Sequence, residues 1–290
     1  MTTAPIALIH HDAHLLVVDK PAGLLVHRSA LDAHETDTLV ERLQRQLGLG
    51  PQDFLAPAHR LDKGTSGLLV LARQRAAAQA LGLQFDPGHA APDAPRPDRP
   101  HRRYLTLVRG WPPLQTRVDH PLARDPERPS QGQVQLAAST WLRRLARVEW
   151  PFTTDPRHPG SRYALVLAEP QTGRRHQIRR HLKHLAHPVV GDSTHGKGQH
   201  NRAVAAWTGH PRLWLHALGL RLAHPADGRP LALQAAPGPE WAHLLGLPGW
   251  TVEPDLPPLP PAHGPDALHA WADALATLDI EPAPAAPSPR

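Results

Sequence analysis

The sequence contains no cysteine, one methionine and few aromatic residues over its length of 290 residues. Without cysteine, the chain has no disulfide bonds, no thiolate nucleophile and no thiolate metal ligand. No apolar run approaches the roughly 18 residues that a membrane-spanning helix needs. The first residues lack a basic segment, and histidine and aspartate interrupt their apolar run. We therefore expect no signal peptide and a cytoplasmic protein.

Lysine is scarce as well, so that arginine supplies most of the positive charge. The whole chain has a net charge of +6, and the segment 171–202 alone carries seven basic residues and one acidic residue. These basic residues are Arg174, Arg175, Arg179, Arg180, Lys183, Lys197 and Arg202. A local excess of this kind is typical of a surface that binds a polyanion such as RNA. A solvated surface would show the same pattern, and the charge alone does not separate the two.

The hydrophobic pattern predicts a mixture of strands and helices. Two apolar runs in 6–28, joined by a turn composition around Pro21, predict a strand pair, and 66–73 predicts a buried strand. Helical spacing in 38–48 and in 174–187 predicts two helices. Strands and helices follow no regular alternation, which favours an α+β fold over a doubly wound parallel sheet.

Several histidines follow the first basic residues of this segment, namely His176, His181, His184, His187, His195 and His200. Spacings of three and four place two imidazoles on one helix face, as in some metal sites. However, the sequence has no HExxH motif and no carboxylate within this helix, so we expect no metal. The stretch QTGRRHQ at the entrance of the helix is compatible with an anion site or with a plain capped turn.

Asp62 raises the central question of the sequence. It lies in HRLDKGTSGLLVLAR, between a basic pair and a turn of small residues that leads into a buried strand. Aspartate commonly caps such turns, so its position alone does not indicate chemistry. Asp32 in HRSALD also follows a His-Arg pair but lacks the turn and the strand.

Five ordered blocks decide the question by resemblance. They are LLVVDKPAGLLVH, AHRLDKGTSGLLVLA, RRYLTLVRG, EPQTGRRHQIRRHLKHLAHPVVGDSTHG and RLWLHALGLRLAHP. In content and order they resemble the RluA-type pseudouridine synthases over about residues 6–240. The resemblance implies a mainly antiparallel mixed β-sheet flanked by helices and loops, with an active-site cleft across the sheet. It also implies an isomerase that converts uridine to pseudouridine in RNA without a cofactor.

The resemblance assigns roles to individual residues. Asp62 would be the reacting carboxylate, acting as a nucleophile on C1′ or as a base at C2′, and these two routes stay open. Arg179 would pair with this carboxylate, and Tyr104 would lie against the target base. Arg60 would occupy the space left by a flipped nucleotide. The other expected RNA contacts are His59, Arg174, Arg175, Arg180 and Lys183.

Finer features concern the substrate and the ends of the chain. LLVHRSALD and LKHLAHPVVGDSTHGKGQHNR resemble the branch of the family that modifies uridine 65 of tRNA. Ribosomal RNA as substrate, and a non-catalytic RNA-binding protein, remain alternatives. We expect a monomer with a catalytic domain over 1–250 that includes a proline-rich loop at 86–100 and has no S4-type domain. A proline-rich linker at 251–265 and a helix with a disordered tail at 266–290 would follow it.

Overall fold

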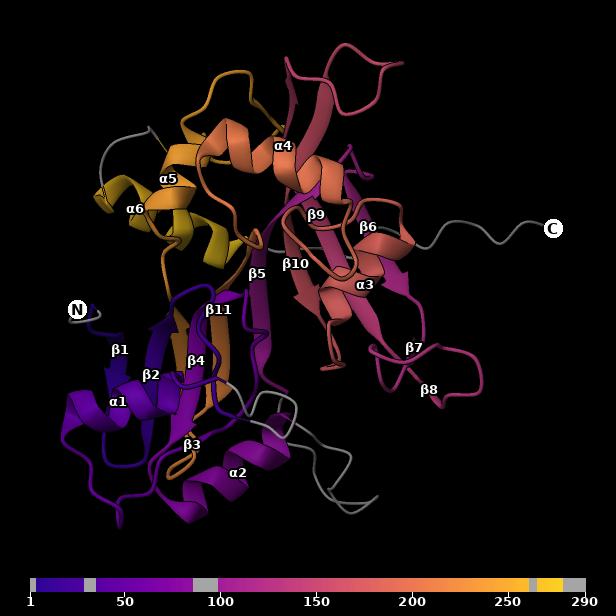
Figure 1. Ribbon diagram of the computed structural model, residues 1–290. Coiled ribbons are helices and arrows are strands. Elements are labelled where there is room, and N and C mark those ends of the chain that lie inside the picture. The colour runs from indigo at the N-terminus through magenta and orange to yellow at the C-terminus, as the bar shows by residue number, and fades with distance from the viewer. Residues whose placement is uncertain (1–3, 29–34, 86–98, 261–264, 279–290) are drawn as a thin grey trace. The chain divides into compact units, whose positions relative to one another are not determined.

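The computed structural model describes residues 4–28, 35–85, 99–260 and 265–278 (Figure 1). Most of the proline-rich loop expected at 86–100, the comparison residue Asp32 and the expected disordered tail lie outside the described residues. Within the described ranges, no helix combines the length and apolar character that crossing a membrane requires.

The chain divides into two compact units. The first comprises Met1–Arg102 and Leu215–Ala236, and the second comprises Arg103–Trp214 and Pro237–Arg290. The first unit contains β1 (Ala7–His11), β2 (Leu15–Lys20), α1 (Leu39–Leu47), β3 (Ala56–Pro57), β4 (Ser66–Ala72), α2 (Arg75–Phe85), β11 (Leu215–Ala223) and β12 (Pro230–Gln234).

The sheet of the first unit is mainly antiparallel. Its strands run in the order β1-β2-β4-β11-β12, β3 pairs with β4, and only the pair of β4 and β11 is parallel. Every residue of β4 is buried, as expected for the central apolar run SGLLVLA. Helix α1 begins at the cap Thr38, whose hydroxyl accepts the amide of Glu41.

Residues 6–28 do contain a strand pair, but not the one expected between the two apolar runs that flank Pro21. Strands β1 and β2 pair around Asp12, whose carboxylate accepts the amides of His14 and Leu15 at 2.7 and 2.9 Å. The second apolar run, 24–27, forms only one bridge, between Leu25 and Thr38. The prediction was wrong because Asp12, whose carboxylate accepts two amides, closes a tight turn between β1 and β2. The segment at Pro21 instead accepts a hydrogen bond from Lys20, which also binds the loop of Asp62.

The second unit is built on an antiparallel sheet. Strand β5 spans His101–Arg109, and its residues from Arg103 onward belong to this unit. The other strands of the unit are β6 (Gln115–Asp119), β9 (Ser139–Trp150), β10 (Ser161–Pro170) and β13 (Thr251–Val252). Strand β10 lies between β5 and β9, and both β6 and β13 pair with β9. A short pair, β7 (Leu122–Ala123) and β8 (Gln135–Leu136), stands apart from this sheet.

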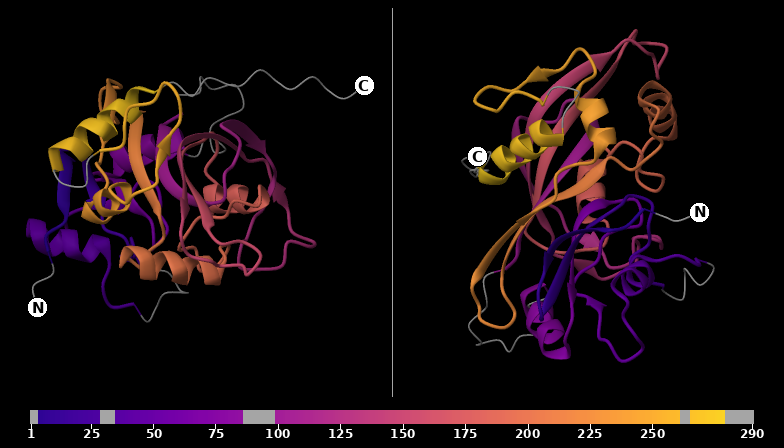
Figure 2. Two further views of the ribbon diagram at one scale, coloured as in Figure 1. Left: turned by 90° about the horizontal axis from the view of Figure 1, so that it is seen from above. Right: turned by 90° about the vertical axis from the view of Figure 1, so that its left-hand side faces the viewer.

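The helices of the second unit, in its described residues, are α3 (Gln177–His184), α4 (Gly198–Thr208), α5 (Pro239–Leu245) and α6 (Pro265–Thr277). Helices α4 and α6 lie on opposite sides of its strands (Figure 2). Helix α3 is shorter than the expected 174–187 because His176, at φ 55°, breaks the helical backbone before Gln177. The mainly antiparallel strands and separate helices of both units confirm the expected α+β class.

Candidate active site

Asp62 lies in the loop between β3 and β4, and its side chain is partly buried. Its backbone carbonyl accepts the amide of Thr65 at 3.0 Å, which closes the small-residue turn expected from the sequence. The turn is therefore closed by the main chain of this residue. The carboxylate is not needed for this turn bond.

Lys20, at the end of β2, holds this loop from inside the protein. Its ammonium is fully buried and donates to the carbonyls of Pro21 and Leu24, both at 2.8 Å, and of Lys63 at 3.1 Å. A buried ammonium needs such acceptors, because removing it from water without partners is costly. The bond to Lys63 fixes the residue next to Asp62. Lys20 was not among the residues expected at the site, although a lysine that ends a buried strand is a signal for such a role.

Gly67 fixes the other end of the loop. It has φ 105°, and a Cβ at this position would lie 2.3 Å from the carbonyl oxygen of Ala217 in β11. Ser66, beside it, shares a hydrogen bond of 2.8 Å with Nδ1 of His216. The close parallel approach of β4 and β11 thus requires glycine and holds the residues that follow Asp62 rigidly.

His59 and Arg60, which precede Asp62, differ sharply in environment. Nε2 of His59 accepts the amide of Val70 at 3.1 Å, and its ring stacks on Phe85 at a centroid distance of 4.6 Å. Burial, with the nearby charge of Arg102, lowers the pKa of His59 to about 3, so the ring is neutral at pH 7. One ring nitrogen is thus committed to the main chain, while Arg60 is exposed.

Tyr104 lies on β5 in the second unit, opposite Ala168 of β10. Ala168 in turn pairs with Leu142 of β9, and Thr140 lies two residues earlier on the same face. Gln177 and His181 of α3 both bond to the hydroxyl of Thr140, at 3.0 and 2.9 Å. Tyr104 therefore points to the face of the sheet that α3 covers.

The neighbouring Arg103 points to the opposite face. Its guanidinium is buried, binds Glu169 at 2.5 Å and donates to the carbonyls of Leu275 and Ala276 at the end of α6, at 2.8 and 2.5 Å. This contact anchors α6 to the strand that carries Tyr104. A cation at the carboxyl end of a helix is also favourable for the helix dipole.

Arg179 is held in a buried ion pair within the second unit. Its Nε and Nη2 donate to the two carboxylate oxygens of Asp192, both at 2.7 Å. Asp192 also accepts the amides of Thr194 and His195, both at 2.9 Å. Burial raises the pKa of Asp192, but Arg179 and these amides outweigh it, so the pKa lies below its ordinary value. Asp192 is the residue that the sequence analysis missed, although it is the only acid in the basic segment.

The other expected RNA contacts separate into two groups. Arg174 donates to the carbonyl of Ala137 at 3.1 Å, and Arg175 forms an ion pair with Glu127. Arg180 and Lys183 instead line a common pocket on the exposed side of α3. These two residues are brought together around one cavity.

The histidines near α3 are structural partners of one another and of the main chain. His181 bonds through its two ring nitrogens to Thr140 and to the carbonyl of His120, and Nδ1 of His176 lies 3.1 Å from Nε2 of His195. Over the described part of the chain, no group of three or more histidine or carboxylate side chains has the arrangement to hold a metal ion.

Comparison with known proteins agrees with these features. The family model described as RNA pseudouridylate synthase matches residues 14–184 of the chain. The chain belongs to this family. It is therefore an RNA pseudouridine synthase, an isomerase, and the matched residues include Asp62, Tyr104 and Arg179.

Two bacterial relatives are similar over most of their length. The tRNA pseudouridine synthase C of Vibrio cholerae is 38% identical over 248 residues, which cover 84% of this chain and 96% of that protein. The protein of the same name from Salmonella typhi is also 38% identical and is covered to 90%.

A solved structure shares the fold. Human RNA Pseudouridylate Synthase Domain Containing 1 superimposes with a TM-score of 0.62 at 25% identity, over 97% of this chain and all of that chain. This similarity confirms the mixed, mainly antiparallel sheet that the resemblance predicted.

Proposed function

We propose that this RNA pseudouridine synthase acts on tRNA and modifies uridine 65. The carrying observation is the 38% identity to tRNA pseudouridine synthase C over nearly the full length of that protein. The stretch from Leu182 to Arg202, which resembles the branch of the family that modifies uridine 65, supports the same substrate. The proposal further includes a cytoplasmic, monomeric enzyme.

In the proposed reaction, Asp62 is the carboxylate that acts on the ribose of the target uridine. The bond between C1′ and N1 breaks, the uracil rotates, and a bond between C1′ and C5 forms. The proton of C5 is lost and N1 gains one, so the reaction needs no oxidant or reductant. The rigid anchoring of the loop by Lys20 and Gly67 supports this role, because a reacting group must keep its position within a fraction of an ångström.

Arg179 and Tyr104 complete the proposed set of catalytic residues. Arg179 is buried and fixed by Asp192, and Tyr104 projects on the face of the sheet covered by α3. In this proposal Tyr104 stacks on the uracil and Arg179 keeps the reacting carboxylate ionised. The base must leave the helical stem, at a cost of a few kcal/mol. Arg60, which is exposed, is assigned to the space that the base leaves.

The test uses tRNA that carries tritium at C5 of uridine. We expect tritium release by the wild-type enzyme and none by Asp62→Asn, with wild-type release by the exposed control Asp53→Asn. Carbodiimide mapping of RNA from a deletion strain then locates the target. Loss of pseudouridine at tRNA position 65 supports the proposal. A modified tRNA together with an unmodified ribosomal site would replace tRNA by ribosomal RNA as the substrate.

A further inference from the structure

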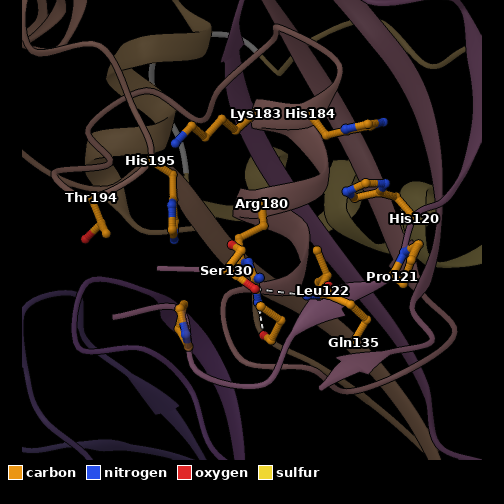
Figure 3. Close-up of a pocket in the computed structure, with 12 residues that line it drawn as sticks. His120, Pro121, Leu122, Ser130, Gln135, Arg180, Lys183, His184, Thr194 and His195 are labelled. Carbon is orange, nitrogen blue, oxygen red and sulfur yellow. Dashed lines mark hydrogen bonds between the residues drawn. The ribbon is translucent and has the colours of Figure 1, made fainter. Parts of the chain in front are cut away.

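A cationic pocket opens on the exposed side of α3, within the second unit (Figure 3). Its volume is about 530 Å³, and its walls come from α3, the β7–β8 pair with its connecting loop, and residues 194–195. Arg180 lies between His195 on one side and the neighbouring rings of His120 and His184 on the other (Figure 3).

The lining of this pocket is positive and contains no carboxylate. Arg180 and Lys183 supply two charges, and three histidines add hydrogen-bonding nitrogens. The buried acid Asp192 is neutralised by Arg179, and the two acids of the β7–β8 loop, Asp125 and Glu127, are engaged by Arg128 and Arg175. The positive charge of the pocket is therefore not balanced by the acids close to it. A carboxylate-free lining disfavours a divalent cation and favours an anion.

Arg180 and the histidine walls are held in place before any ligand arrives. Nη1 of Arg180 donates to the carbonyl of Ala123 at 2.9 Å, and the other nitrogens of this guanidinium group can face the pocket. The rings of His120 and His184 stack at 3.8 Å with an angle of 15°, and His181 binds the carbonyl of His120 at 3.0 Å. Such preorganisation lowers the entropic cost of binding. Burial lowers the pKa of His120, and the charges of His184 and Arg180 lower it further.

We propose that this pocket binds a backbone phosphate of the substrate RNA, with Arg180 and Lys183 as charged donors and His120, His184 and His195 as its walls. The proposal deepens the function proposed above and rests on RNA being the substrate. Arginine matches the geometry of phosphate oxygens, and lysine adds a mobile point charge. The basic segment as a whole was expected to bind backbone phosphates, whereas the pocket brings Arg180 and Lys183 together at one place.

The size of the pocket points to a phosphate within a chain. A volume of about 530 Å³ lies in the range that accommodates a small organic ligand. A free phosphate ion would leave most of it filled with water. A phosphodiester with its flanking riboses fits the space better, so RNA should bind much more tightly here than inorganic phosphate.

The experiment compares two lysines of the same basic segment. Lys183 lines the pocket and Lys197 does not, and both side chains are exposed. Affinity for tRNA is measured with Asp62→Asn as the parent, so that binding occurs without turnover. We expect Lys183→Gln and Arg180→Gln to weaken binding several-fold and to reduce the salt slope by about 1 each. In the active enzyme, the same variants should raise KM and leave kcat nearly unchanged. Lys197→Gln should change affinity clearly less.

A second measurement separates the two sources of phosphate. The ring signals of His120 and His184 are followed by NMR during titration with an RNA hairpin or with inorganic phosphate. We expect shifts at low concentrations of RNA and only at far higher concentrations of phosphate. Equal losses in the Lys183 and Lys197 variants, or ring signals that RNA leaves unmoved, would overturn the pocket. If wild-type enzyme modifies no tRNA yet the hairpin binds through Lys183, the proposed substrate fails and the pocket stands.

Discussion

The loop of Asp62 and the segment around Arg179 carry two expected catalytic residues, yet different bonds stabilise them. At the two ends of the Asp62 loop the anchors are main-chain contacts: Lys20 donates to three carbonyls, and Gly67 packs against the main chain of Ala217. Around Arg179 the central contact is a buried ion pair with Asp192, whose carboxylate also accepts two main-chain amides.

The difference indicates what each segment tolerates. Backbone contacts depend on shape, so the Asp62 loop should be sensitive to added volume at its two anchors. An ion pair depends on charge and on hydrogen-bonding pattern, so the Arg179 segment should be sensitive to isosteric substitutions that alter charge. The predictions below test this contrast in each unit.

The largest effect is expected for Gly67→Ala. The added Cβ would lie 2.3 Å from the carbonyl oxygen of Ala217 and 2.7 Å from its nitrogen, and no rotamer change of a side chain can relieve a clash with backbone. Together with the positive φ, we expect a loss of about 4 kcal/mol of unfolding free energy and of nearly all activity. Urea denaturation and tritium release measure the two effects.

Gly82→Ala is the matched control in the same unit. Gly82 lies within helix α2, and a Cβ there would have no neighbour within 4 Å. We expect a gain of roughly 0.5–1 kcal/mol, because alanine favours the helix. Equal stability of the two variants would contradict the close approach of β4 and β11.

In the second unit, Asp192→Asn should have the next largest effect. The substitution keeps the shape but removes the negative charge that neutralises Arg179, and an amide cannot accept all four hydrogen bonds. We expect a loss of about 3 kcal/mol in stability, as is common when a buried pair loses one partner. kcat should fall more than KM rises, because Arg179 loses its orientation.

Asp155→Asn provides the comparison for this prediction. Asp155 pairs with Arg157 at 2.6 Å, but Arg157 is largely exposed. Exposed pairs contribute little, so its unfolding transition should overlay that of the wild type. If Asp192→Asn were as stable and as active as Asp155→Asn, the ion pair of Arg179 with Asp192 would neither stabilise the unit nor orient Arg179.

The sequence indicated much of this site because short motifs combine turn residues, a buried strand and charges in a fixed order. The turn before β4, the basic helix and the α+β class could all be predicted. The pairing of Arg179 with Asp192 could not, because spacing along the chain does not show which carboxylate reaches which guanidinium. The inward lysine Lys20 was missed since lysine is usually exposed.

The longest strand, β9, was not predicted at all. It spans Ser139–Trp150, and its alternation of buried residues breaks at Arg143 and Arg144. The register with β10 shifts at the same place, between Leu165 and Val166. A bulge reverses the faces to which later residues point, so a period of two is interrupted and the pattern of a strand is lost.

The smallest effect at neutral pH concerns two neutral histidines, one in each unit. Burial is the main cause that lowers the pKa of His59 to about 3 and that of His195 to about 4, from 6.5. Below pH 6.5 the unfolded chain therefore binds more protons than the folded chain. Their contribution to stability is complete above pH 6.5 and is lost as the pH falls through the folded pKa.

Replacing each histidine by glutamine should flatten the pH dependence of the unfolding free energy. The change per residue lies below the limit of about 1.4 kcal/mol per pH unit for a single proton. His59→Gln should flatten the profile from pH 6.5 to 3, whereas His195→Gln should act only down to pH 4. Between pH 4 and 3, only the His59 variant should then differ from the wild type in slope. Profiles that run parallel to the wild type over the whole range would show that neither ring is held neutral by its unit.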